Sequence, residues 1–118
     1  MYKIPFNRAD ITVDDQALMV DAIARGHISG NGFYTKQAES LIEQSMGSAK
    51  ALLTTSCTHA LEMSALLVNL KPGDEVIVPA YTFVSTASAF MLYGAKPVFV
   101  DVQSDTLNID PDLVEASI

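Results

Sequence analysis

The sequence predicts an α/β fold, and two observations carry this prediction. Short apolar segments at 49–54, 75–78 and 96–102 alternate with helical segments at 60–70 and 85–93. Strands that alternate with helices are typical of parallel βαβ units. The predicted strands are also apolar at successive positions, as expected where helices cover both faces of a sheet. We therefore expect part of a three-layer αβα sandwich.

The residue pattern of the N-terminal part predicts helices and no strands. Residues 1–12 have no clear period, and we interpret them as an irregular arm. Apolar residues recur at helical spacing over 14–25, a segment that Gly26 ends. A second helical pattern ends at Gly47, and Thr35 is placed to cap its start.

We expect two regions, an arm with helices over 1–48 and the first βα units of a larger domain over 49–118. Near the end of the chain, Asp110 is a good N-cap and Pro111 suits the first position of a helix. The sequence stops inside this predicted helix, which indicates a fragment of a longer domain.

Composition excludes several classes of function. Seven basic and fourteen acidic residues give a net charge of −7, which argues against nucleic acid and anionic membrane as partners. The single cysteine, Cys57, allows no internal disulfide. No signal peptide and no run of 18 apolar residues is present, and the two histidines lack zinc-site spacing, so no metal site is expected. We expect a cytoplasmic protein.

A small polar segment, Thr54 to His59, joins a predicted strand to a predicted helix. Free amides and the helix dipole make such a junction a good phosphate site, and the hydroxyls of Ser56 and Thr58 add donors. The alternative is an ordinary capped helix with Ser56 or Thr58 as the cap.

A second segment, Pro79 to Thr86, follows the next predicted strand and carries Tyr81 and Phe83. Ligands of α/β proteins bind beyond the carboxyl ends of parallel strands, where an aromatic side chain can cover a flat ring. The alternative is that Phe83 packs in the core and Tyr81 lies on the surface.

Cys57 suggests a further, weaker hypothesis. A thiol at a helix N-terminus can ionise readily, which would suit a cysteine-dependent enzyme. His59 is too close in sequence to form an easy dyad with it, and a cysteine that lines the phosphate site is the preferred interpretation.

Taken together, these segments resemble the DegT-type family of pyridoxal-phosphate (PLP) sugar aminotransferases, which have the aspartate aminotransferase fold (type I). The resemblance covers nearly the whole chain. It is carried by Ile4-Pro5-Phe6-Asn7, Gly47-Ser48-Ala49-Lys50, Leu53 to Met63, Pro72 to Pro79, Tyr81 to Ala87, Phe99-Val100-Asp101-Val102 and Thr106 to Asp110.

The resemblance implies roles for both segments and for an earlier loop. The expected phosphate-binding residues are Ser56, Cys57, Thr58 and His59. Phe83 is expected to stack on the pyridine ring, and Thr82 and Ser85 to line the same pocket. The glycine-rich loop of Ser29, Gly30, Asn31 and Gly32 matches a segment near the sugar nucleotide at a dimer interface.

The resemblance also implies that several functional residues of the family are absent from this chain. The family's Schiff-base lysine, the aspartate that pairs with the pyridine nitrogen and a further phosphate-site serine fall beyond residue 118. None of the five lysines, Lys3, Lys36, Lys50, Lys71 and Lys96, matches the catalytic position, and Lys50 and Lys96 are predicted to open strands at the opposite end. We therefore expect no catalytic residue in this chain.

The expected function belongs to the longer parent protein. It is a homodimeric, cytoplasmic transaminase that moves an amino group, with glutamate as the expected donor, to a 4-keto-6-deoxy sugar nucleotide for surface-polysaccharide synthesis. The alternative is a truncated, non-catalytic product that at most binds phosphate or a partner. By itself the chain is expected to expose apolar faces and strand edges and to self-associate.

Overall fold

The computed structural model describes residues 4, 5 and 7–118. The chain divides into two compact units, Met1–Leu53 and Thr54–Ile118, and each is described by itself. The predicted boundary lay after residue 48. Within the predicted arm, the described residues before Thr12 form no helix or strand, and residues 1–3 and 6 lie outside the described part.

The first helix of the N-terminal unit is α1 (Val13–Ala24), close to the predicted 14–25. Thr12 and Asp15 form a reciprocal capping box at its start. The Asp15 amide donates to Thr12 Oγ1 at 3.2 Å, and the Thr12 amide donates to Asp15 Oδ2 at 2.8 Å. The predicted stop at Gly26 is confirmed, since this residue has a φ of +73°.

The second helix, α2 (Phe33–Met46), begins earlier than predicted, so Thr35 is not its cap. Gly32 holds the N-cap position. A Cβ built on Gly32 would lie 3.2 Å from His27 Cδ2, which leaves little room for a capping side chain. The predicted end is confirmed, because Gly47 adopts the left-handed conformation with a φ of +64°.

The predicted strand at 49–54 is wrong, since the structure has no strand there. The amides of Ala51 and Leu53 donate to the carboxylates of Glu43 and Glu39, at 3.0 and 3.1 Å, and not to a neighbouring strand. Carboxylates of α2 therefore accept hydrogen bonds from amides that would otherwise be available to pair with a neighbouring strand. It follows that Lys50 does not open a strand.

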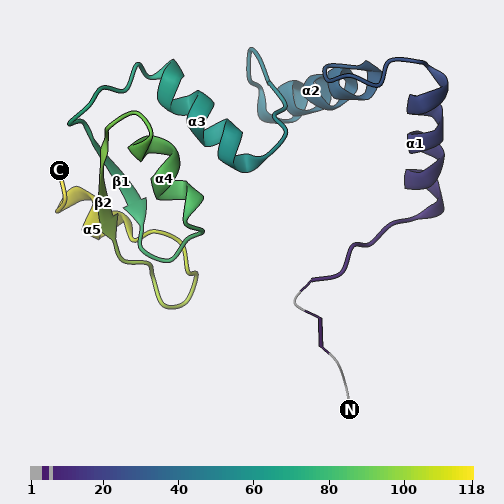
Figure 1. The fold of residues 1–118 in the computed structure, drawn as a ribbon. Coiled ribbons are helices and arrows are strands. Elements are labelled where there is room, and N and C mark those ends of the chain that lie inside the picture. Colours follow the sequence, from purple (N-terminus) through teal and green to yellow (C-terminus); the bar gives the residue numbers. More distant parts are fainter. Residues whose placement is uncertain (1–3, 6) are drawn as a thin grey trace. The chain divides into compact units, whose positions relative to one another are not determined.

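The C-terminal unit contains the parallel sheet and confirms the α/β prediction. Its elements are α3 (Cys57–Leu67), β1 (Glu75–Pro79), α4 (Ser85–Met91), β2 (Lys96–Val100) and α5 (Pro111–Glu115). The two strands pair in parallel from Glu75 opposite Lys96 to Pro79 opposite Val100. Helix α4 packs on both strands and α3 packs against α4 (Figure 1).

The core of this unit is made of small side chains. Val78 is the largest fully buried residue at 2% exposure, and the other buried residues are Ala65, Ala87, Ala89, Ala95 and Val100. Alanines on α3 and α4 let helix backbones approach each other closely. Many larger apolar side chains stay exposed, among them Leu66, Leu67 and Phe99, which agrees with the expectation of uncovered apolar surface.

The last segment follows the sequence prediction closely. The Asp112 amide donates to Asp110 Oδ1 at 3.0 Å, which makes Asp110 the N-cap of α5, and Pro111 occupies the first turn. The strand predicted over 96–102 ends at Val100 as β2. Val102 instead forms an isolated antiparallel bridge with Ile109.

Candidate cofactor site

The first predicted segment forms a tight turn directly before α3. Ser56 is the N-cap, and its Oγ accepts a hydrogen bond from the His59 amide at 3.1 Å. Thr54 Oγ1 donates to the Ser56 carbonyl at 2.7 Å, and Thr55 Oγ1 lies 2.5 Å from His59 Nδ1. Local hydrogen bonds therefore fix the turn and the imidazole of His59.

At the start of α3, the amides of Cys57 and Thr58 remain available to a ligand. None of the described residues accepts a hydrogen bond from the amides of Cys57 and Thr58, whereas the His59 amide is bound to Ser56. These free amides stand at the positive end of the helix dipole, where an anion is favoured. Ser56 thus caps the helix, as the alternative held, and still leaves two donors for a phosphate.

The second predicted segment connects β1 to α4. The Ala80 amide donates to the Val100 carbonyl at 2.8 Å and ties the carboxyl ends of the two strands together. Phe83 is 74% exposed and Tyr81 is 68% exposed, so Phe83 does not pack in the core. Both rings are free to contact a ligand beyond the strand ends.

Two predicted pocket residues flank the start of α4. Thr82 Oγ1 lies 2.9 Å from Thr86 Oγ1, a distance at which the two hydroxyls share a hydrogen bond. Ser85 is the first residue of α4, and the N-cap, Val84, makes no side-chain capping bond. The Thr54–His59 and Thr82–Ser85 segments belong to one compact unit, in which α3 packs against α4.

The glycine-rich loop Ser29–Gly32 belongs to the other unit, where it wraps around His27. His27 Nε2 lies 3.2 Å from the Gly30 carbonyl and 3.2 Å from Ser29 Oγ. Asn31 adopts a φ of +60°. A cavity of about 180 Å³ beside the loop is lined by Ala22, Arg25, His27, Ser29, Gly32, Phe33, Tyr34 and Thr35.

The donors of the C-terminal unit fit a phosphorylated aromatic cofactor. Free amides at a helix start suit a phosphate, and an exposed phenylalanine in the loop after a strand suits a flat ring. Among residues 4, 5 and 7–118, no group of three or more metal-ligating side chains gathers. No helix in the described part of the chain is long and apolar enough to cross a bilayer.

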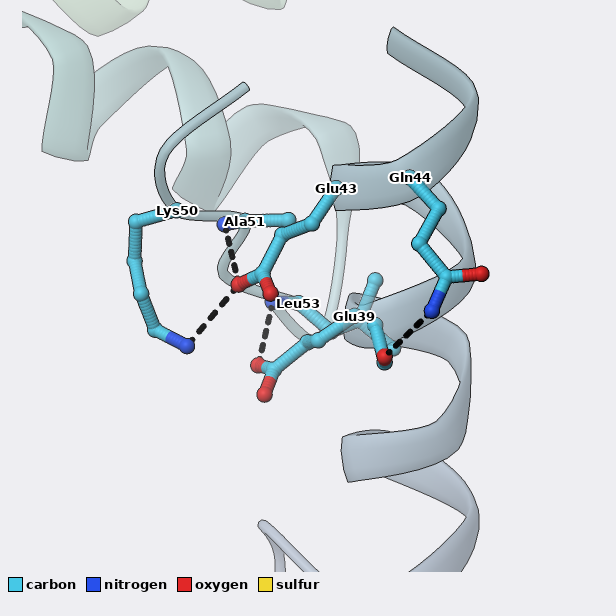
Figure 2. Close-up of polar contacts among 7 residues, drawn as sticks. Glu39, Glu43, Gln44, Lys50, Ala51 and Leu53 are labelled. Carbon is cyan, nitrogen blue, oxygen red and sulfur yellow. Dashed lines mark hydrogen bonds and ion pairs between the residues drawn. The ribbon is translucent and has the colours of Figure 1, made fainter. Parts of the chain in front are cut away.

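Sequence reasoning missed two features near this site. One is the Thr55–His59 hydrogen bond. The only signal for it in the sequence is that the two residues are four positions apart. The other is the pair of carboxylates, Glu39 and Glu43, that binds the segment before the turn (Figure 2). Their spacing of four residues on a helix was a usable signal, but their partners are backbone amides, which sequence patterns do not reveal.

A parallel β1–β2 sheet with α4 packed on it, and free amides at the start of α3, are features of the α/β class of proteins. The family model of the DegT/DnrJ/EryC1/StrS aminotransferase family matches residues 10–118. The chain belongs to this family, whose members use pyridoxal phosphate.

Solved structures agree with this assignment. The sugar aminotransferase Spr1654 from Streptococcus pneumoniae, in its pyridoxamine phosphate (PMP) form, is 38% identical over 99% of this chain with a TM-score of 0.82. The 3-amino-5-hydroxybenzoic acid synthase is 35% identical over 92% with a TM-score of 0.80. A GDP-4-keto-6-deoxymannose-3-dehydratase with a trapped PLP-glutamate geminal diamine is 30% identical over 93% with a TM-score of 0.77.

The chain spans less than a third of the length of these relatives. It covers 29% of Spr1654, 29% of the synthase and 30% of the dehydratase.

Proposed function

We propose that these residues form the N-terminal part of a PLP-dependent sugar aminotransferase and supply part of its cofactor site. The observation that carries the proposal is the pair of free amides of Cys57 and Thr58 at the start of α3. They lie in the same unit as an exposed Phe83 in the loop between β1 and α4. Membership in this family supports the assignment of the PLP phosphate to these amides.

In this proposal each residue has a physical task. The amides of Cys57 and Thr58 donate to the cofactor phosphate, while Ser56 and His59 hold the turn in shape. Phe83 covers one face of the ring, and Thr82 and Ser85 line the pocket. The bound cofactor would supply the electron sink that amino-group transfer needs.

The described lysines do not suit covalent attachment of the cofactor. Lys50 Nζ is bound to the Glu43 carboxylate at 2.8 Å. Lys96 opens β2, at the end of the strand opposite the carboxyl edge. Lys36 lies on α2 and Lys71 in the turn before β1, while Lys3 lies outside the described residues. We propose that the catalytic lysine is not among residues 1–118 and that these residues alone do not catalyse transamination.

For the substrate, we propose a 4-keto-6-deoxy sugar nucleotide, with glutamate as amino donor, in a cytoplasmic homodimer that serves surface-polysaccharide synthesis. The specific activity proposed is that of a dTDP-4-amino-4,6-dideoxygalactose transaminase. Support comes from the sugar aminotransferases among the relatives and from the Ser29–Gly32 loop, which His27 holds beside a cavity. The dehydratase relative is the reason to test a second outcome, loss of a hydroxyl without net amino transfer.

The experiment uses the protein in the full length that its gene encodes. It is purified with PLP, and glutamate is added with a 4-keto-6-deoxy sugar nucleotide, with dTDP and GDP carriers compared. Formation of an amino sugar nucleotide supports the proposal, whereas a deoxygenated keto sugar would assign the dehydratase reaction. A protein that binds no PLP under these conditions would contradict both.

A further inference from the structure

The segment that leads into the phosphate-binding turn is held by two carboxylates of α2. Glu43 Oε1 accepts from the Ala51 amide at 3.0 Å and from Lys50 Nζ at 2.8 Å, and Glu39 Oε1 accepts from the Leu53 amide at 3.1 Å. Figure 2 shows both carboxylates pointing from the helix toward this segment. We call Glu39 and Glu43, with the amides they bind, the carboxylate clamp.

In the clamp, the spacing of the two carboxylates along the helix matches the spacing of the two amides along the bound segment. Glu39 and Glu43 are four residues apart on a helix, a rise of about 6 Å. Ala51 and Leu53 are two residues apart, about 6.6 Å in an extended chain, and amides at that spacing point to the same side. The carboxylates of one helical turn therefore meet alternate amides of a chain that runs in the opposite direction.

Both backbone contacts of the clamp are charge-assisted hydrogen bonds. Each amide donates to a carboxylate, and hydrogen bonds to charged acceptors are about twice as strong as neutral ones. The Glu43 side chain is only 25% exposed, while that of its partner Lys50 is 69% exposed. Because the Lys50 ammonium group and the Ala51 amide both donate to Glu43 Oε1, the ammonium group helps to hold the carboxylate in position for the amide.

We propose that Glu39 and Glu43 are positioning residues for the cofactor phosphate. Leu53, which Glu39 binds, directly precedes Thr54, the first residue of the phosphate-binding turn. Between Leu53 and Cys57 the chain has only three residues, so the clamped segment and the donor amides are close neighbours along the chain. This inference rests on the proposed cofactor site.

The test uses the full-length protein in its PMP form, because that cofactor has no aldehyde to react with a lysine. Two quantities are measured for wild type, Glu39→Ala, Glu43→Ala and Glu43→Gln. One is amide hydrogen exchange in peptides that cover 50–54, and the other is the dissociation constant for PMP. Gln37→Ala, on the same helix but outside the clamp, is the matched control.

We expect alanine at either position to speed exchange at 51 or 53 by about 10-fold or more and to weaken PMP binding by about 10-fold. Glu43→Gln retains an acceptor oxygen and should recover part of both losses, which also keeps the test usable if an alanine variant folds poorly. Gln37→Ala should change neither quantity.

The two measurements separate the ways in which the inference can fail. Unchanged exchange in both alanine variants would overturn the clamp itself. Faster exchange with unchanged PMP affinity would show a purely structural clamp and overturn its positioning role. A wild-type protein that binds neither PMP nor PLP would overturn the proposed function, and with it the positioning role.

Discussion

Gly94 lies so close to Pro72 that a Cβ built on it would stand 2.9 Å from the proline Cβ. The glycine also has a φ of +80°, a conformation that other residues adopt only at a cost. The Gly73 amide donates to its carbonyl at 2.9 Å, which joins the turn before β1 to the end of the helix before β2. The packing of the two segments that lead into β1 and β2 therefore depends on a glycine at position 94.

We expect Gly94→Ala to destabilise the protein by about 3 kcal/mol, because a left-handed backbone and a steric clash both contribute. Gly26→Ala is the matched control. It has a φ of +73° but no atom within 4 Å of the added Cβ, so a loss of about 1 kcal/mol is expected. Denaturant unfolding of both variants gives the comparison, and equal losses would argue against the Pro72 contact.

Ser56→Ala should remove the cap of α3 and cost about 1 kcal/mol, because the His59 amide then loses its acceptor. Ser85→Ala provides the control at the start of α4, where the N-cap is Val84 and makes no side-chain capping bond. Thermal unfolding of the two variants decides the matter. If both lose the same stability, the capping role of Ser56 is wrong.

Asp21 should make stability depend on pH. The hydrogen bond from Arg25, and then that from the Tyr34 hydroxyl at 2.7 Å, lower the pKa of Asp21 below its ordinary value. A lowered folded-state pKa gives stability that is fully present above the unfolded pKa of about 4. This stability is lost as the pH falls through the folded value.

The same contact acts in the opposite direction on Tyr34, because its hydrogen bond to Asp21 raises the pKa of the phenol. That contribution is present below about pH 10 and disappears as the pH rises through the folded value. We expect Asp21→Asn to flatten the acid limb of a stability–pH curve. Asp14→Asn removes a carboxylate from the same helix, where the described residues provide no side-chain bond to it, and serves as the matched comparison. Parallel curves for wild type and Asp21→Asn would contradict this account.

Phe83→Ala should weaken PMP binding by about 3- to 10-fold, since an aromatic contact of this kind contributes roughly 0.5–1.5 kcal/mol. Phe83→Tyr keeps the ring and should recover affinity. Tyr81→Ala removes a similarly exposed ring from the same loop and serves as the control. Equal effects at positions 81 and 83 would show that Phe83 has no special contact with the cofactor.

The sequence allowed prediction of the elements that local signals define. Gly26 and Gly47 end helices as expected, and Asp110 with Pro111 starts one. The parallel strands at 75–79 and 96–100 also follow their apolar patterns. These features depend on neighbouring residues in the chain, so a local pattern is sufficient to identify them.

Features that depend on distant partners were not predictable in this way. The apolar run at 49–54 resembles a strand, but the carboxylates of Glu39 and Glu43 bind its amides. Thr35 is a good capping residue, yet His27 packs beside Gly32 and the helix begins earlier. The Thr54–His59 turn was predictable as the start of a helix, whereas the partner of each amide in it depends on the folded geometry.

The most direct test of the central claim is a crystal structure of the full-length protein with PMP bound. We expect phosphate oxygens at about 2.7–3.2 Å from the amide nitrogens of Cys57 and Thr58, with the Phe83 ring against the pyridine ring. A cofactor phosphate held elsewhere, with these two amides bound to water or to protein, would contradict the account.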